Sequence, residues 1–175
     1  MNAITLHAKT LELCHGFFRG FEQDAALFMD ASLYESYVYD PRRVEAFFKA
    51  QSQKNDYKGF FVMLEGKPIG DVGFKRIDRE KMECELEICM QSDEVKGRGL
   101  GTQAIRLALE YGFRELKMER IFADVVLKNE RSRHIVEKLG FTLVGGGELH
   151  RRFVLASADY KKTSGSAVGQ PQKGN

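Results

Sequence analysis

This sequence contains little of what marks the specialised protein classes. It has three cysteines in 175 residues, Cys14, Cys84 and Cys89. Three is an odd number, so they cannot all pair in disulfides, and no two of them form a C-x-x-C motif. We therefore expect neither a disulfide framework nor a bound metal, and a reducing compartment fits best. The longest apolar runs, such as residues 60–64, fall far short of the roughly 18 residues needed to span a bilayer.

We also expect no leader segment, and the net charge is small. Residues 1–9 have neither the basic start nor the apolar stretch of a signal peptide, so we expect a soluble, cytoplasmic protein without a membrane partner. Lys and Arg total 27 against 25 Asp and Glu, a formal net charge of +2, which predicts no nucleic-acid partner. The content of 43% hydrophobic and 30% charged residues is instead typical of a globular domain.

The C-terminal stretch differs in composition from the rest of the chain. Residues 159–175 are polar and rich in Gly and Ser, so they bury too little apolar surface to order themselves. The remaining length suits one domain, and it shows no repeat at a solenoid or propeller period. We predict a single domain over residues 1–158 and a disordered tail over residues 159–175.

Helices are predicted for most of the first third of the chain. Thr10 is a suitable N-cap for a helix with apolar residues at helical spacing, and Asp40 followed by Pro41 marks a second helix start. Asp24 is expected to cap a further turn over residues 25–29.

Extended segments dominate the remainder, and two helices interrupt them. Residues 59–91 are predicted to form three antiparallel strands joined by short turns. The later elements are a helix over residues 99–116, a strand over 121–127, a helix over 129–139, and strands over 141–144 and 152–155 with a turn at Gly145-Gly146-Gly147. This order predicts a mixed α/β fold.

The Gly-rich basic loop ahead of the helix at residues 99–116 is the most informative segment. It reads Lys96-Gly-Arg-Gly-Leu-Gly-Thr102, with three alternate glycines and two cations. Glycines let backbone N–H groups approach a ligand, and a helix start presents unpaired N–H donors at the positive end of its dipole. These features favour a cradle for a phosphate or pyrophosphate over an ordinary flexible turn.

Two other phosphate-binding motifs are less compatible with the sequence. A P-loop is excluded because no Gly-Lys-Ser/Thr follows at the required spacing. Gly99-Leu-Gly-Thr-Gln-Ala104 satisfies the dinucleotide fingerprint, and Asp124 lies about 20 residues farther on. However, the preceding strands form a meander, and Asp124 falls inside its strand rather than past its end. An NAD(P)-binding protein is therefore the less favoured alternative.

The loop resembles the acyl-CoA motif of the GNAT acetyltransferases, usually written Arg/Gln-x-x-Gly-x-Gly/Ala. Asn129-Glu-Arg-Ser132 and Val136-Glu-Lys-Leu-Gly-Phe141 resemble the motif that follows it in that family. The likeness is greatest to the branch that includes ribosomal-protein N-terminal and spermidine acetyltransferases. It implies an α/β fold of the α+β type, with a mixed, mostly antiparallel central sheet flanked by helices.

The resemblance implies an N-acetyltransferase that moves the acetyl group of acetyl-CoA to a primary amine by direct attack in a ternary complex. The amine would be a polyamine, a peptide N-terminus, a lysine or an aminoglycoside, and homodimers are common in related folds. The backbone of residues 98–102 would hold the pyrophosphate, and the strand end would pair with pantetheine. The implied cofactor-binding residues are Met90, Gln91, Lys96, Gly97, Arg98, Gly99, Leu100, Gly101, Thr102, Asn129 and Ser132.

Two departures from the family pattern are visible. Lys96 replaces the usual Arg or Gln, which keeps the charge but loses a planar multidentate donor. Val136 occupies the position of the Tyr that often protonates the departing thiolate, although a thiol of pKa about 8.5 leaves with little help. Candidate substitutes are Tyr34, Tyr37, Tyr39 and His134. The missing Tyr makes a non-catalytic acyl-CoA-binding sensor the alternative function.

Acetyl transfer to an amine also requires a base, because an alkylamine with a pKa of about 10.4 is protonated at neutral pH. Glu83, Glu85 and Glu87 alternate along one predicted strand, so their carboxylates share one face of the sheet. Glu85 and Glu87 lie nearer the Gly-rich loop and are the candidate catalytic residues, although alternating glutamates also form ordinary solvated faces. A carboxylate face would in addition attract a cationic amine.

Overall fold

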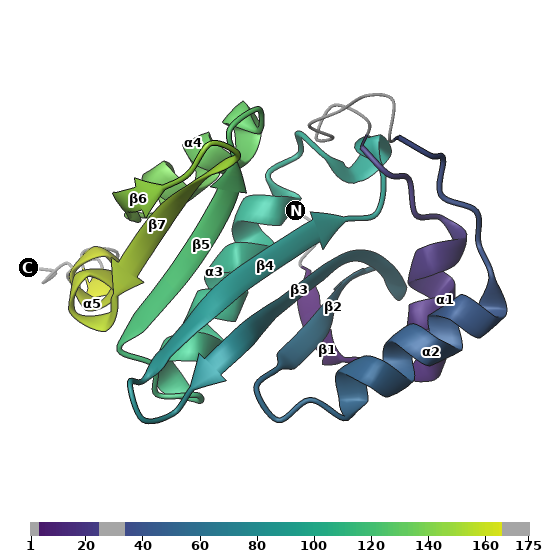
Figure 1. The fold of residues 1–175 in the computed structure, drawn as a ribbon, viewed down its shortest axis with the longest axis horizontal. Helices are drawn as coiled ribbons and strands as arrows, with labels where there is room; N and C mark the ends of the chain where they lie inside the picture. The colour runs from purple at the N-terminus through teal and green to yellow at the C-terminus, as the bar shows by residue number, and fades with distance from the viewer. Residues whose placement is uncertain (1–3, 25–33, 166–175) are drawn as a thin grey trace, which may run out of the picture.

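The centre of the molecule is a seven-stranded sheet with the strand order β1-β2-β3-β4-β5-β7-β6 (Figure 1). The computed structural model describes residues 4–24 and 34–165. The strands are β1 Thr5–Ala8, β2 Lys58–Leu64, β3 Lys67–Asp78, β4 Glu83–Met90, β5 Arg120–Val126, β6 Thr142–Gly146 and β7 His150–Ala156. β4 and β5 pair in parallel, and the other neighbouring pairs are antiparallel. The predicted mixed, mostly antiparallel sheet is confirmed.

Helices cover both faces of this sheet. They are α1 Leu11–Arg19, α2 Pro41–Ser52, α3 Leu100–Arg114, α4 Glu130–Lys138 and α5 Ser157–Gly165, with a short 3-10 turn, η3, at Asp93–Val95. Phe60 belongs to the core cluster that includes α3, whereas Phe61 packs with α1 and α2. Because successive strand residues point to opposite faces, α3 lies on one face and the α1–α2 pair on the other. No helix within the described ranges is long and apolar enough to cross a membrane.

Both predicted helix starts in the N-terminal third are confirmed by side-chain capping. Thr10 caps α1 and Asp40 caps α2, each by accepting a hydrogen bond from a backbone N–H of the first turn, at 3.2 and 2.9 Å. Pro41 begins α2, where its missing N–H leaves no helical hydrogen bond unmade. The turn expected over residues 25–29 lies outside the described residues.

The predicted glycine turn near the C-terminus is wrong. Gly145 and Gly146 belong to β6, where they pair with Arg152 and Arg151 of β7. Gly146 adopts a φ of +149°, which favours glycine, so the strand continues through a backbone shape that other residues rarely take. The connection to β7 is made instead by residues 147–149.

Helix α5 occupies the first part of the predicted tail. Tyr160 stacks on Phe113 of α3, with the ring centroids 4.8 Å apart. The Gly- and Ser-rich composition of the segment does not reveal this single aromatic contact. The tail prediction is therefore wrong for residues 159–165, and residues 166–175 lie outside the described part of the chain. The single-domain assignment stays a prediction.

The parallel pair of β4 and β5 is short. Its register runs only from Glu83 with Arg120 to Glu85 with Phe122, although both strands continue beyond that point. The pairing ends at Glu85, and toward their ends the two strands diverge (Figure 1). Among the described residues no other strand pairs with this side of β4, so an interior strand has a free edge over its last residues.

Candidate active site

The Gly-rich loop leads into the start of α3, as the sequence predicted. Gly99 is the N-cap with a φ of +77°, and no side chain caps the helix there. The N–H of Gln103 donates to the carbonyl of Gly99 at 3.1 Å, so the N–H groups of the three preceding residues have no partner within the helix. A Cβ built at Gly97 or Gly99 would meet no atom within 4 Å. The helix start is thus open to an anion, which its dipole favours.

The free edge of β4 lies beside this helix start. A Cβ built at Gly101 would lie 3.8 Å from Sδ of Met90, so the first turn of α3 contacts the end of the strand. The N–H of Gln91 donates to the carbonyl of Ile69 on β3 at 2.9 Å. Since strand residues direct their backbone groups to alternate sides, Met90 and Ile88 direct theirs toward the open side between β4 and β5. Ile88 was missed from the sequence because strand pairing was not visible there.

The backbone groups of Gln91, which the resemblance placed beside pantetheine, are hydrogen-bonded within the protein. Its N–H is bound to β3, and its carbonyl accepts a hydrogen bond from the N–H of Glu22 at 2.8 Å. Its side-chain Nε2 donates to the carbonyl of Phe17 at 2.6 Å. Gln91 therefore joins the strand end to the segment after α1, and neither backbone group is free to pair with pantetheine.

The ammonium group of Lys96 is already paired with two carboxylates of the protein. Its ammonium lies 2.7 Å from Asp93 and 3.0 Å from Asp24, which is far away in the sequence. Burial would lower the pKa of Lys96, but the hydrogen bonds that its ammonium donates to the two carboxylates raise it. The expected free cation at this position is therefore offset by two carboxylates, whereas Arg98 has an exposed side chain.

The residues of the second implied motif have structural roles in α4. The side-chain oxygen of Asn129 accepts a hydrogen bond from the N–H of Ser132 at 3.0 Å, which makes Asn129 the N-cap of this helix. Val136 is only 4% exposed and belongs to the main core cluster, whereas His134 is exposed. The Val136 position thus offers no proton donor, as the sequence indicated.

The dinucleotide alternative does not fit this arrangement. Asp124 lies inside β5, where both of its carboxylate oxygens bind Arg152 of β7 at 2.9 and 2.8 Å. A dinucleotide fold would need a parallel doubly wound sheet with the acidic residue free at a strand end. Neither condition is met.

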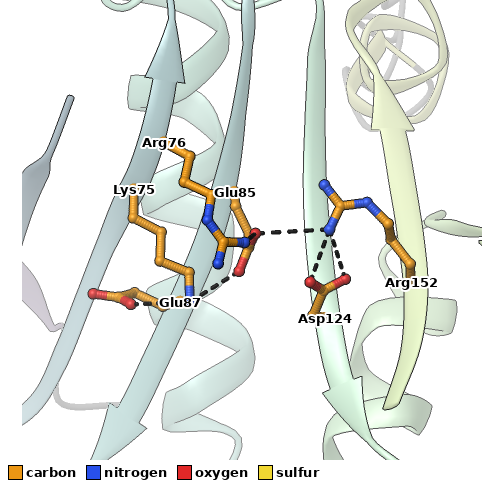
Figure 2. Close-up of polar contacts among 6 residues, drawn as sticks. All are labelled: Lys75, Arg76, Glu85, Glu87, Asp124 and Arg152. Atoms are coloured by element: carbon orange, nitrogen blue, oxygen red, sulfur yellow. Dashed lines mark hydrogen bonds and ion pairs between the residues drawn. The ribbon is translucent and has the colours of Figure 1, made fainter. Parts of the chain in front are cut away.

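Glu85 and Glu87 lie in very different surroundings on the same strand (Figure 2). The ammonium of Lys75 lies between their two carboxylates, 2.9 Å from Glu85 and 3.5 Å from Glu87. Arg76 binds the other oxygen of Glu85, and Arg152 approaches it at 3.7 Å. The side chain of Glu85 is 4% exposed, whereas that of Glu87 is 36% exposed.

An irregularity in β3 explains why two consecutive cations reach one carboxylate. The β3–β4 register shifts after Lys75, and Arg76 has a φ of +51°, so the usual alternation of side chains is interrupted. Burial acts to raise the pKa of Glu85, but the hydrogen bond and charge of Lys75, with those of Arg76, lower it overall. A carboxylate held in this way is a weak base.

The expected acidic face is not acidic. Three carboxylates, those of Glu85, Glu87 and Asp124, lie among three cations, those of Lys75, Arg76 and Arg152. The guanidinium of Arg152 also lies over the ring of Phe122, 4.5 Å from its centroid. The sequence of β4 shows only the glutamates. The cations that balance their charge come from the neighbouring strands β3 and β7.

A family model described as the acetyltransferase (GNAT) domain matches residues 4–142 of this chain. Among curated proteins, spermidine N(1)-acetyltransferase of Escherichia coli K12 is 32% identical over 135 residues, which cover 77% of this chain and 64% of that protein. The putative ribosomal N-acetyltransferase YdaF of Bacillus subtilis is 28% identical over 80 residues, 46% of this chain and 43% of that protein. The chain spans less than two thirds of the length of these relatives.

Solved structures share the fold over nearly the whole chain. A chimera of the Vibrio cholerae spermidine N-acetyltransferase SpeG and hSSAT aligns with a TM-score of 0.75 at 23% identity, covering 90% of this chain and 97% of that one. The Vibrio cholerae enzyme in complex with CoA and spermine aligns with a TM-score of 0.71 at 22% identity, with the same coverage. A dodecameric form of that enzyme gives a TM-score of 0.70 at 22% identity, covering 92% and 98%.

Proposed function

Because this chain belongs to the GNAT acetyltransferase family, we propose that it transfers the acetyl group of acetyl-CoA to a primary amine. The observation that carries this proposal is the uncapped start of α3 beside the free edge of β4. A helix start suits a pyrophosphate, and a free strand edge suits an amide-containing arm. The two features lie together, as one extended ligand with both groups requires.

Cosubstrate binding would use the chain's backbone more than its side chains. The N–H groups of Leu100, Gly101 and Thr102 point out of the first turn of α3 and would donate to the pyrophosphate. The exposed Arg98 would add charge, while Lys96 would hold the loop through its aspartate partners. Met90 and Ile88 would pair with the pantetheine amides, and Asn129 would act by fixing the start of α4.

Glu87 suits the role of base better than Glu85. It is half-buried, close enough to solvent to meet an amine or a bridging water, and it has one cation at 3.5 Å rather than three. Glu87 would take a proton from the ammonium group directly or through water. The amine nitrogen would then bond to the thioester carbon, and the carbon–sulfur bond would break with the electron pair leaving on sulfur. The second proton of the nitrogen would pass to the thiolate or to water, which leaves the neutral amide. A thiol with a pKa of about 8.5 needs little protonation to leave.

The acceptor is proposed to be a polyamine, with a peptide N-terminus, a lysine or an aminoglycoside as the other amine classes to be compared. The support comes from the relatives, which include a spermidine N(1)-acetyltransferase and an enzyme solved with spermine. The balanced charges around Glu85 give no separate preference for a polycation. A cytoplasmic location and a homodimer stay predictions, and the structural relatives include a dodecamer.

Binding of CoA tests the first half of the proposal. Calorimetry should show binding to the wild-type protein and its loss in Gly101→Asp, because a carboxylate at the helix start repels a pyrophosphate. The matched control is Gly101→Ala, whose Cβ would make only ordinary contact with Met90 at 3.8 Å and should leave binding intact. Absence of binding to the wild-type protein would refute the proposal.

Turnover tests the second half. Thiol release from acetyl-CoA should depend on an added amine, and Glu87→Gln should lower kcat/KM for that amine by about 100-fold or more, as expected for loss of a general base. Glu83→Gln is the control, because Glu83 lies on the same strand but pairs with Arg120 at its other end. Equal losses in the two variants would contradict the assignment of Glu87.

A CoA-binding sensor without catalysis is the second candidate function. The buried Val136 favours it, because the position that often holds a protonating Tyr carries a core side chain instead. This candidate predicts CoA binding with no thiol release for any amine in a panel of polyamines, peptides and aminoglycosides. Amine-dependent release would exclude it.

A further inference from the structure

Two glycines lie opposite each other on β2 and β3, beside Glu87 of β4. Gly59 of β2 lies opposite Gly73 of β3, and Gly73 lies opposite Glu87 of β4. A Cβ built at Gly59 would approach Cε1 of Tyr57 to 2.8 Å, and one built at Gly73 would lie 3.2 Å from its Oη. A side chain at Gly59 would collide with the phenol, whereas one at Gly73 would first meet the backbone of β2, at the carbonyl oxygen of Lys58, 2.8 Å away. Gly59 therefore leaves room for the Tyr57 ring, and the hydroxyl of that ring lies against Gly73.

A buried lysine orients that hydroxyl. The ammonium of Lys9 donates to Oη of Tyr57 at 2.8 Å, to Asp71 at 2.7 Å and to Gln51 at 2.9 Å. The Lys9 side chain is 7% exposed, and its ammonium also lies 5.2 Å from the centroid of the Tyr57 ring. An ammonium has three hydrogens, and all three are used here. Oη of Tyr57 therefore accepts from Lys9, which leaves its own hydrogen to be donated elsewhere.

The phenol hydroxyl lies on the side of the sheet that carries Glu87. Gly73 is the cross-strand partner of Glu87, and a Cβ built at Gly73 would lie 3.2 Å from Oη of Tyr57, which places the hydroxyl near the Glu87 side chain. Burial, followed by the charge of Asp71 and then that of Glu87, raises the pKa of Tyr57. The phenol therefore stays protonated and remains a donor. On its other side Glu87 meets Lys75 at 3.5 Å. A half-exposed glutamate has several rotamers available, and partners on both sides leave it one orientation.

We propose that Tyr57, oriented by Lys9, donates its hydroxyl hydrogen to Glu87 and is thereby a positioning residue that fixes the Glu87 carboxylate for the acceptor amine. The proposal rests on the proposed function, because it assumes that Glu87 meets the amine. It adds a line of contacts that runs from Asp71 through Lys9 and Tyr57 to Glu87, beneath α1 and α2. These residues come from four separate segments of the chain.

The test is Tyr57→Phe, which removes only the hydroxyl and keeps the ring over the glycine pair. We expect kcat/KM for the amine to fall about 10-fold, the loss typical of one hydrogen bond to a charged group. The KM for acetyl-CoA should change little, whereas the melting temperature should fall, because Tyr57→Phe leaves one hydrogen of the buried Lys9 ammonium without an acceptor. The loss should appear in kcat rather than in the KM for the amine, because a misplaced base slows proton removal without removing a binding contact.

Two comparisons make the test decisive. Tyr111→Phe is the matched control, because Tyr111 packs on Phe60 and Phe74 on the opposite face of the sheet and should leave the rate unchanged. Adding Tyr57→Phe to Glu87→Gln should cause no further loss if Tyr57 acts through Glu87. An unchanged kcat in Tyr57→Phe, or an equal loss in the Glu87→Gln background, would overturn the proposal. An inactive wild-type protein would instead count against the proposed function.

Discussion

Two glutamates on one strand show how much a residue's role depends on its neighbours. Glu85 and Glu87 share a face of β4, yet Glu85 is enclosed by Lys75, Arg76 and Arg152, whereas Glu87 keeps a half-exposed carboxylate. The buried carboxylate links β4 to β3 and to β7. We interpret Glu85 as a structural anion of the sheet, and this interpretation makes a prediction about stability.

Glu85→Gln should lower the free energy of unfolding by about 1–3 kcal/mol at pH 7, because it leaves buried hydrogen-bond partners without a charged acceptor. The folded-state pKa of Glu85 is lowered, so its contribution is present above the unfolded pKa and is lost as the pH falls through the folded value. The difference between wild type and variant should therefore shrink in acid. Denaturant unfolding at neutral and acidic pH measures both effects.

Glu83→Gln is the control for this measurement. Its carboxylate is more exposed and pairs with Arg120, so the loss should be about 0–1 kcal/mol. If the two variants lost equal stability, with no dependence on pH, the role assigned to Glu85 would be wrong.

At the scale of elements, short-range signals were readable from the sequence and long-range ones were not. The caps at Thr10 and Asp40 and the glycine start of α3 depend on residues a few positions apart, so the sequence predicted them. The Lys96–Asp24 pair joins residues 72 positions apart, and the Lys9–Tyr57 contact joins residues 48 positions apart. Only folding brings such groups together, so no local pattern could indicate them.

Helix α5 is the clearest element-scale correction, and one of its contacts is the aromatic pair of Tyr160 and Phe113. Tyr160→Ala should lower the free energy of unfolding by about 1–3 kcal/mol, since it removes the partly buried ring that stacks on Phe113. The exposed neighbour gives the control, because Lys161→Ala should change stability by less than about 0.5 kcal/mol. Thermal unfolding followed by circular dichroism would distinguish them, and equal effects would mean that α5 is not held by this contact.

At the scale of the whole molecule, one sheet separates two cores. The larger contains α3 and residues such as Phe60, and the smaller contains Phe17 of α1 with Val44 and Phe61. Both cores use β2, with neighbouring residues pointing in opposite directions. The line of contacts from Asp71 to Glu87 lies on the same side as the smaller core.

Because the two cores share a sheet, they should unfold together. Phe17→Ala should cost about 3–5 kcal/mol, the usual loss for a large aromatic side chain that is fully buried. Circular dichroism of the backbone and of the tyrosines should still report one coincident transition. Two separate transitions in the wild-type protein would show that the α1–α2 layer is an independent unit.

The short pairing of β4 with β5 has a consequence for amide hydrogen exchange. The amides of Ile88 and Met90 face the open side of β4, whereas those of Glu87 and Cys89 face β3. In the free protein the amides of Ile88 and Met90 should therefore exchange fast, and those of Glu87 and Cys89 should exchange slowly. Added CoA should slow the two fast amides, so that the cosubstrate itself completes the hydrogen bonding of the sheet.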